Sequence, residues 1–411
     1  MRIGLLTTSF PRTLDDSAGA FVLGFARALA ALGHELEVLA PEPAEHCEPL
    51  RAPGIVTRHV RYLRPRVLQR TFYGAGVPDN LRRDARAWLG AATFPFALAR
   101  ECAAREHGWD ALVSHWALPS ALVAGSAQRG RPHLAVFHSA DLHLLCRIPG
   151  KAQLAERIAR QASALWFVSP QHRDAFLELL PECERPATTA RAFVSPMGID
   201  APEPALGREQ SRRELALQRF SVLALSRLVP IKGLDTAIRA LAGQDASLLI
   251  AGDGIEREPL ARLAREVGSD VRFLGHAGPE QKRRLFAAAD AFVMPSRTLS
   301  TGRSEGVPTA LLEAMAHGLP AVATRSGGMP SLVEHERTGL LVPEDDPSAL
   351  AAALQRVRSD GDLRLRLANA GRSSALRFAW PQLGPAAEAL LRRQLDPMRE
   401  LSDVRAPTSR L

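Results

Sequence analysis

Short apolar runs alternate with longer stretches of helical periodicity along almost the whole chain. In the first half we predict buried strands at residues 2–9, 35–41, 111–116, 133–138, 164–169 and 191–196. The pattern then begins again, with strands predicted at residues 220–227, 246–252, 271–275, 291–296, 321–326 and 339–344. Short buried strands separated by amphipathic helices are typical of a parallel sheet covered by helices. The chain is therefore predicted to contain two doubly wound α/β domains.

Breaks in this pattern suggest where the domains begin and end. A polar, proline-containing stretch at 201–218 separates the two halves and is predicted to be a linker. We expect an N-terminal Rossmann-like domain at 1–200 and a second one at 219–375. The helical tail at 376–411 is expected to pack back on the first domain. A length of 411 residues suits two domains, since a domain usually has about 150 residues.

Composition narrows the class of protein. A hydrophobic content of 46% with 23% charged residues is typical of a globular chain. The sequence has no uncharged apolar run of about 18 residues and no signal peptide, so we expect a cytoplasmic protein. The cysteines have no C-x-x-C spacing, which indicates neither a zinc site nor a disulfide framework.

The chain is basic, with a formal net charge of +8. Such a charge suits nucleic acid, an anionic membrane surface or a phosphorylated substrate. Residues 51–86 carry nine arginines against Asp79 and Asp84, interleaved with apolar side chains, as in a basic amphipathic surface. An ordinary solvated face is the alternative interpretation. Nucleic acid is the least favoured partner, because the sequence has no zinc-finger spacing, RNP-like strand or long Lys/Arg block.

Charged side chains follow the first predicted strand of the second domain. Arg227 ends this strand, and Lys232 follows five residues later, just before a glycine. The chain has only three lysines, at positions 151, 232 and 282, against 49 arginines. An arginine fork and a compact ammonium on one loop suit a diphosphate. Two exposed surface charges are the alternative.

Two glutamates flank the start of another predicted helix. Glu305 lies in a loop, Pro308 is expected at the first helical position, and Glu313 lies more than one turn inside the helix. The amides near Gly306 and Val307, together with the helix dipole, form an anion site. The two carboxylates are better suited to the hydroxyls of a sugar or a ribose, which donate hydrogen bonds to them. An ordinary exposed helical glutamate is the alternative for Glu313.

Glycines and a histidine also follow predicted strands. Gly19 precedes the first helix, and His138 ends a strand of the first domain. A buried core histidine bonded to the backbone is the alternative for His138. In the second domain Gly327 and Gly328 form a turn that would admit close backbone approach by a ligand.

Two further motifs do not support a cofactor or metal site. The pair Gly252 and Gly254 lacks the third glycine of a dinucleotide site, so a nicotinamide cofactor is not supported. The sequence Asp360-Gly361-Asp362 lies between two helical stretches, where we expect a surface turn and not a metal site.

Five stretches are informative together: TTSFPRT with the helix and strand that follow it, SRLVPIKGLDTAIRAL, LLIAGDGIEREPLARLA, VRFLGHAGPEQKRRLFAAADAFVMPS, and the long run from SEGVPTALLEAMAHG to VPEDD. Together they resemble the family 4 glycosyltransferases. The segments HWALPSALVAG and FHSADLHLL look like members that build bacterial surface polysaccharides. The resemblance implies a GT-B fold, with two Rossmann-like domains facing each other across a cleft.

The resemblance also implies an activity. The expected reaction is a retaining, metal-independent transfer of a hexose from a UDP- or GDP-sugar to a glycan or lipid-linked acceptor, with no other cofactor. The first domain would face the acceptor, and the second would bind the nucleotide sugar. Peripheral contact with an anionic membrane, on its inner face, is a further hypothesis. A sugar epimerase, a glycan phosphorylase and a nonenzymatic nucleotide-sugar-binding scaffold remain alternatives.

Residue roles follow from the same resemblance. It implies a catalytic set in which two cations hold the donor diphosphate and two side chains face the sugar: Arg227, Lys232, Glu305 and His138. It implies a donor-binding set of backbone groups and one ribose-binding carboxylate: Gly19, Gly306, Val307 and Glu313. No metal ligand is expected.

Overall fold

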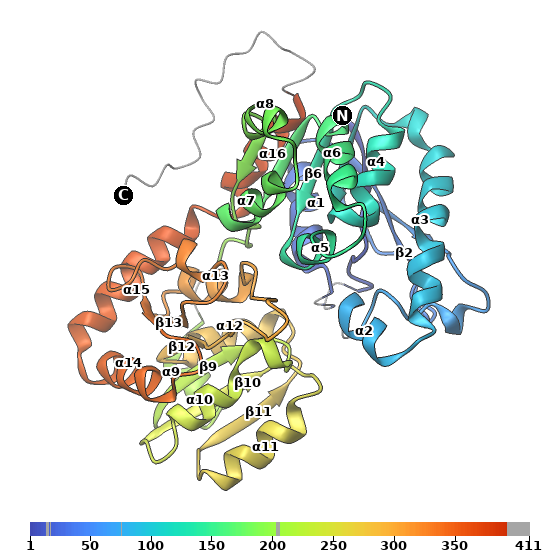
Figure 1. Cartoon of the computed structure of the whole chain (residues 1–411). Coiled ribbons are helices and arrows are strands. Elements are labelled where there is room, and N and C mark those ends of the chain that lie inside the picture. The colour runs from blue at the N-terminus through green and yellow to red at the C-terminus, as the bar shows by residue number, and fades with distance from the viewer. Residues whose placement is uncertain (14–15, 17, 75, 203–205, 393–411) are drawn as a thin grey trace. The chain divides into compact units, whose positions relative to one another are not determined.

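Two compact α/β units make up the computed structural model, which describes residues 1–13, 16, 18–74, 76–202 and 206–392. The first unit contains Met1–Gly198 together with the helix that begins at Trp380, and the second is Ile199–Ala379. Each unit has one sheet flanked by helices (Figure 1). The predicted α/β class with two Rossmann-like halves is confirmed.

The sheet of the first unit has eight strands in the order β3-β4-β2-β1-β5-β6-β7-β8. All neighbours are parallel except the short edge pair β3 and β4. The strands are β1 Arg2–Leu6, β2 Glu35–Pro41, β3 Arg51–Ala52, β4 Ile55–Val60, β5 Ala111–His115, β6 His133–Phe137, β7 Ala164–Phe167 and β8 Ala192–Val194. The helices are α1 Ala20–Ala31, α2 Val77–Arg83, α3 Ala87–Ala103, α4 Leu122–Ala127, α5 Ser139–Leu145, α6 Lys151–Gln161, α7 Pro170–Glu178, α8 Arg185–Thr189 and α16 Trp380–Arg392.

The sheet of the second unit has six parallel strands in the order β11-β10-β9-β12-β13-β14. They are β9 Phe220–Leu225, β10 Ala246–Ala251, β11 Val271–Gly275, β12 Ala291–Met294, β13 Ala321–Thr324 and β14 Leu340–Val342. The helices are α9 Arg208–Glu214, α10 Leu234–Ala240, α11 Arg257–Glu266, α12 Pro279–Ala288, α13 Thr309–Ala316, α14 Pro347–Ser359 and α15 Gly361–Leu376. The chain order reverses between β9 and β12, which makes their carboxyl ends the expected ligand edge.

The strands are almost continuous apolar runs because helices cover both faces of each sheet. Every residue of β5, β6 and β10 is buried. All twelve predicted strands are present, although most are a few residues shorter at their ends. The helix ends also differ slightly: Pro308 has an extended backbone and precedes the first turn of α13, which begins at Thr309.

The prediction for residues 51–86 needs correction, because the start of this stretch forms β3 and β4. Its apolar side chains do not form one exposed face. Phe72 is buried in a cluster with Tyr62 and Phe94, and the rings of Phe72 and Phe94 lie 4.4 Å apart. Part of the arginine content is structural as well: Arg61 and Arg66 bond to the buried carboxylate of Glu42.

The segments at the predicted boundaries pack on defined partners. In the stretch expected to be a linker, α9 belongs to the second unit, where Arg208 and Arg212 both bond to Asp290. In the tail, α16 packs beside α1 (Figure 1). Trp380 of α16 lies edge-on to Phe25 of α1, with ring centroids 6.0 Å apart. Residues 393–411 lie outside the described part. Among the described residues, no helix has the length and apolar character needed to cross a membrane.

Candidate functional site

The carboxyl ends of β9 and β12 bring together the charged residues predicted in the second unit. Arg227 and Lys232 follow β9, with Lys232 closing a short 3-10 turn at Pro230–Lys232, and Glu305 follows β12. The ammonium of Lys232 donates a hydrogen bond to Glu305 Oε2 at 2.5 Å. Both side chains are largely buried, at 12% and 15% exposed. The hydroxyl of Ser296 donates to the same oxygen at 3.4 Å.

This carboxylate is held in its ionised form. Burial acts to raise the pKa of Glu305, but Lys232 lowers it by charge and by hydrogen bonding, and Arg227 and Arg303 lower it further. The net effect is a pKa below the ordinary value. The edge of the sheet thus presents an ionised carboxylate surrounded by three cationic side chains.

The glycine turn after β13 supports the loop that carries Glu305. The N–H of Gly328 donates to the carbonyl oxygens of Glu305 and Gly306, at 3.2 and 3.1 Å. Gly327 has φ 50°, and a Cβ at that position would lie 1.9 Å from the Glu305 carbonyl oxygen. The close approach that we expected for a ligand is therefore made by the chain's own backbone, which requires glycine at this position.

The second glutamate of the pair lies on α13 and has a partner that sequence reasoning missed. Lys282 of α12 forms an ion pair with Glu313 through Nζ and Oε2, and the two side chains are 30% and 23% exposed. Gly306 and Val307 precede α13 in the loop from Glu305; the glycine is buried and the valine half-buried. The only signal of the Lys282 contact in the sequence is the rarity of lysine.

In the first unit, Gly19 and His138 begin the helices that follow β1 and β6. Gly19 is the N-cap of α1 with φ 69°, and a Cβ there would lie 2.5 Å from the Ser9 carbonyl oxygen. His138 is the N-cap of α5. Phe21 of α1 lies against the ring of His138, with centroids 4.9 Å apart, so the two positions belong to one neighbourhood.

Both ring nitrogens of His138 are in hydrogen bonds. The side chain accepts the backbone N–H of Asp141, whose own side chain accepts the N–H of His138 at 2.9 Å. The other nitrogen, Nε2, lies 3.1 Å from Nδ1 of His115, and the two rings stack. Burial lowers the pKa of His138 to about 3, with a smaller contribution from His172. The ring is therefore neutral near pH 7. Its burial and its bond to the backbone match the alternative given for His138, a buried histidine bonded to the backbone.

The motif Asp360-Gly361-Asp362 has a structural role at the start of a helix. Asp360 caps α15 by accepting the N–H of Leu363 at 2.8 Å, as expected for a turn. In the part of the chain described here, no three His, Cys, Asp or Glu side chains are grouped to hold a metal ion.

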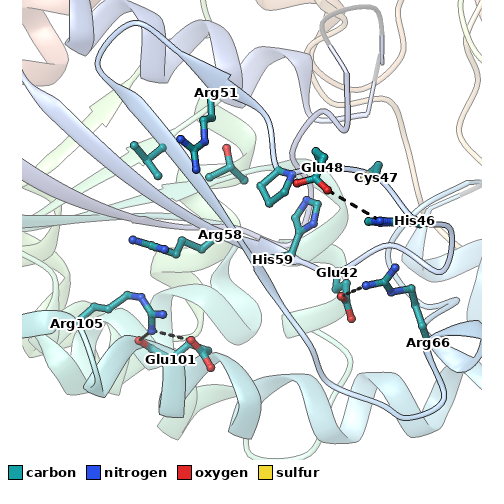
Figure 2. Close-up of a pocket in the computed structure, with 13 residues that line it drawn as sticks. Glu42, His46, Cys47, Glu48, Arg51, Arg58, His59, Arg66, Glu101 and Arg105 are labelled. Atoms are coloured by element: carbon teal, nitrogen blue, oxygen red, sulfur yellow. Dashed lines mark hydrogen bonds and ion pairs between the residues drawn. The ribbon is translucent and has the colours of Figure 1, made fainter.

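A hollow of about 320 Å³ lies at the β3–β4 edge of the first unit (Figure 2). Its charged lining includes Arg58 from β4 and Arg105 after α3. Acidic side chains match these cations: Arg58 pairs with Glu37 at 2.6 Å, and Arg105 pairs with Glu101 at 2.6 Å. The hollow is thus mixed in charge, and most of its lining comes from β4 and from the segment that follows β2.

Two protein-family models together match most of the chain. The model described as glycosyl transferase 4-like domain matches residues 18–190, and the model described as glycosyl transferases group 1 matches residues 207–374. Each therefore matches most of one structural unit.

Curated relatives match over long stretches. A GDP-mannose-dependent alpha-(1-6)-phosphatidylinositol monomannoside mannosyltransferase of Mycobacterium tuberculosis is 32% identical over 302 residues, which is 70% of this chain and 77% of the relative. The amylovoran biosynthesis glycosyltransferase AmsK of Erwinia amylovora is 26% identical over 87% of this chain and 90% of its own length.

Solved structures match in fold. Sucrose-phosphate synthase from Thermosynechococcus elongatus has a TM-score of 0.76 at 22% identity, over 96% of this chain and 99% of that one. HepE of Anabaena, solved in complex with UDP-glucose, has a TM-score of 0.70 at 20% identity, over 95% of this chain and 99% of that one.

Proposed function

Because this chain belongs to the family 4 glycosyltransferases and has their GT-B fold, we propose that it transfers a hexose from a UDP- or GDP-sugar to a glycan or lipid-linked acceptor. The reaction is proposed to be retaining and independent of metal ions. Two of the similar proteins support the donor class: the mycobacterial relative is named as GDP-mannose-dependent, and HepE was solved with UDP-glucose. The named relatives are transferases, which favours transfer over epimerisation, phosphorolysis or a scaffold role.

The main support within the molecule is the ion pair of Lys232 and Glu305, with Arg227 nearby, at the carboxyl ends of β9 and β12. Departure of the nucleoside diphosphate places negative charge on the phosphate oxygens. Arg227 and Lys232 are preorganised cations that would stabilise this charge, and such stabilisation usually contributes more to catalysis than any other single effect. The cost of orienting them is met when the protein folds.

The other side chains are assigned by their chemistry. Glu305 binds the hydroxyls of the transferred sugar and Glu313 binds those of the ribose, because an ionised carboxylate only accepts hydrogen bonds. The amides of Gly306 and Val307 approach the sugar or the phosphates. A retaining glycosidase attacks with one carboxylate of a pair about 5 Å apart. We assign Glu305 to sugar binding instead, with attack on the same face of the sugar and the leaving phosphate taking the acceptor's proton.

In the first unit, Gly19 keeps the start of α1 close to the donor phosphate, and His138 contributes a neutral ring near the sugar. Its low pKa argues against a proton-transfer role, since near pH 7 the ring is uncharged and cannot act as an acid, and as a base it is weak. We therefore propose His138 as a catalytic residue that acts by contact with the sugar.

We further propose that α3 brings the protein into peripheral contact with an anionic membrane on its inner face. Trp88, Leu89 and Phe96 on this helix are 61%, 55% and 79% exposed. Exposed arginines precede and follow them, at positions 82, 83, 86 and 100. Exposed aromatic and aliphatic side chains with flanking arginines suit the boundary between headgroups and acyl chains of anionic lipid. Of these arginines, Arg82, Arg83 and Arg86 belong to the C-terminal end of the stretch 51–86.

The donor proposal is tested by thermal unfolding of the full chain with UDP, GDP and a panel of their sugars. A ligand at 100 times its Kd should stabilise the folded chain by about 2.7 kcal/mol. We expect one nucleotide series to raise the unfolding temperature and its best sugar to be consumed when acceptor is added. Absence of stabilisation by either series would contradict the proposal. Release of a free, altered sugar without acceptor would indicate an epimerase, and dependence on inorganic phosphate would indicate a phosphorylase.

A further inference from the structure

Trp116 has a backbone conformation that tryptophan rarely adopts. It follows β5 directly, with φ 71° and ψ 136°. Residues with a side chain are uncommon at positive φ, and a bulky residue there is a true outlier. Such strain costs free energy and persists only where the surrounding structure enforces it, often at a ligand site. The conformation therefore indicates a role for Trp116 beyond the packing of its side chain.

Hydrogen bonds to two partners hold this conformation. The N–H of Trp116 donates to the carbonyl oxygen of Val136 in β6 at 2.9 Å. The next N–H along the chain, that of Ala117, donates to Asp141 Oδ2 at 2.7 Å. The other oxygen of this buried side chain accepts the N–H of His138 at 2.9 Å. Asp141 therefore fixes the end of β5 against the end of β6 and keeps Trp116 beside His138.

The ring of Trp116 lies in the part of the first unit where a ligand is expected. β5 lies beside β1, where the chain order of the sheet reverses, and ligands of such sheets bind beyond the carboxyl ends of the strands at this point. The ring centroid of Trp116 is 4.9 Å from that of His138 and 5.8 Å from that of Phe21. A sugar in contact with His138, as proposed above, would therefore lie within reach of the indole.

The indole N–H of Trp116 is available to a ligand. Trp109 and Trp166 donate their indole N–H groups to Glu37 and to the carbonyl oxygen of Ser195. The half-buried Trp116 has no such partner among the residues that the structure describes. Its nitrogen is also not one of the fully buried unpaired atoms, so solvent reaches it. An indole combines a flat apolar face with one hydrogen-bond donor, which suits the apolar face and a hydroxyl of a sugar ring.

We propose that Trp116 is a specificity-determining residue that stacks its indole on a sugar ring of a substrate, with Nε1–H donating to a hydroxyl of that sugar. This inference rests on the proposed function, because it takes the carboxyl edge of the first sheet as part of the transferase site. The sugar is that of the donor or that of the acceptor, which present the same chemistry, and the test distinguishes the two. The competing explanation is that Trp116 only packs on Phe21 and His138.

Nuclear magnetic resonance of the indole N–H groups tests the contact in the full chain. With isotope-labelled tryptophan, the Trp116 signal is the one that disappears in Trp116→Phe. If the donor sugar binds there, this signal should shift with the nucleotide sugar selected by thermal unfolding, beyond any change that its nucleoside diphosphate causes alone. If the acceptor sugar binds there, the signal should shift with methyl α-mannoside or methyl α-glucoside added to the diphosphate complex. The control signal is that of Trp88, which is 61% exposed on α3 and should not shift.

Two truncations separate contact with the sugar from packing. Trp116→Ala and Trp116→Gly both remove the ring, but glycine accepts a positive φ and alanine is strained there. We therefore expect Trp116→Gly to unfold at the higher temperature of the two. Both should weaken binding of the sugar that shifts the Trp116 signal by about tenfold, because both lose the stacking surface. Trp116→Phe keeps a ring without the N–H and should lose less.

Calorimetry measures this binding for a nucleotide sugar, and saturation transfer to the ligand measures it for a methyl glycoside. A ring that only supports the fold would give a larger loss in Trp116→Ala than in Trp116→Gly, in step with their unfolding temperatures, and that result would overturn the inference.

Failure of the proposed function gives a different result. If neither UDP, GDP nor any of their sugars stabilised the wild type, the proposed function would be wrong. If a nucleotide sugar stabilised the wild type and Trp116→Gly equally, and no sugar shifted the Trp116 signal, the inference about Trp116 alone would be wrong.

Discussion

Lys232 neutralises the largely buried carboxylate of Glu305. An unpaired buried charge is costly, so each member of such a pair needs the other. The pair with Glu305 meets this need and also keeps the ammonium at the edge of the sheet where the diphosphate is proposed to bind. Stability and function therefore place the same demand on this side chain.

Replacing this lysine tests its role in the reaction. We expect Lys232→Ala to lower turnover by about 10²- to 10³-fold, the loss of about 3 to 4 kcal/mol that follows removal of one preorganised charge donor. The measurement is the steady-state rate with the nucleotide sugar selected by thermal unfolding. Lys151→Ala, on the exposed start of α6, should keep the wild-type rate. A Lys232→Ala protein with full activity would remove the diphosphate assignment.

Among the elements, α3 has apolar side chains on two faces. Its inner face packs into the first unit through Gly90, Phe94 and Leu98. Its outer face leaves Leu89 and Phe96 exposed, seven residues apart and so on one side of the helix. The solvent-facing side of a surface helix usually carries polar and charged residues.

The outer face of α3 should determine lipid binding if the membrane proposal is right. We expect the double variant Leu89→Ser, Phe96→Ser to sediment with phosphatidylglycerol vesicles several-fold less than wild type, because buried apolar area sets interfacial affinity. Binding of the wild type should also fall as salt rises, since salt screens the arginines. Leu365, which is 61% exposed and lies on α15, provides the control: Leu365→Ser should sediment with vesicles as wild type does. Equal sedimentation of all three proteins would contradict the proposal.

At the scale of the whole molecule, the formal net charge of +8 makes the folded state sensitive to low pH. Acidification removes negative charge and adds to repulsion within the compact state. Glu42 opposes this effect in the first unit. Hydrogen bonds from Arg61 lower its pKa most, against burial, and with Gln69 and Arg66 they bring the pKa to about 2.

The sign of this pH effect follows from linkage. A carboxylate with a lower pKa in the folded state gives stability that is complete above its unfolded pKa of about 4.5 and is lost as pH falls through about 2. We expect Arg61→Gln to raise the pKa of Glu42 and move acid unfolding, followed by circular dichroism, to higher pH. Arg337→Gln, which removes a partner of the 58% exposed Glu334, should leave the transition unchanged. An unchanged transition in Arg61→Gln would contradict the assignment.

The amino-acid sequence by itself determined the two sheets and most of their strands. Local periodicity decides whether a segment buries one face or both, and this property needs no knowledge of distant residues. It also placed Arg227, Lys232 and Glu305 after strands, where parallel sheets bring their carboxyl ends to one edge. Residues 51–60 were missed as strands because β4 is not a continuous apolar run like the other strands: exposed Val56 and Arg58 alternate with buried positions.

Only the tertiary structure decided which side chains became partners. Lys282 and Glu313 lie on different helices, Glu42 gathers Arg61 and Arg66 from a later loop, and Gly327 closes on the backbone of Glu305. The stacked pair of His115 and His138 likewise joins the ends of neighbouring strands. Such contacts depend on the spacing between elements that are far apart in the chain. Periodicity says which face of an element is buried, but only packing brings a given donor within hydrogen-bond distance of a given acceptor.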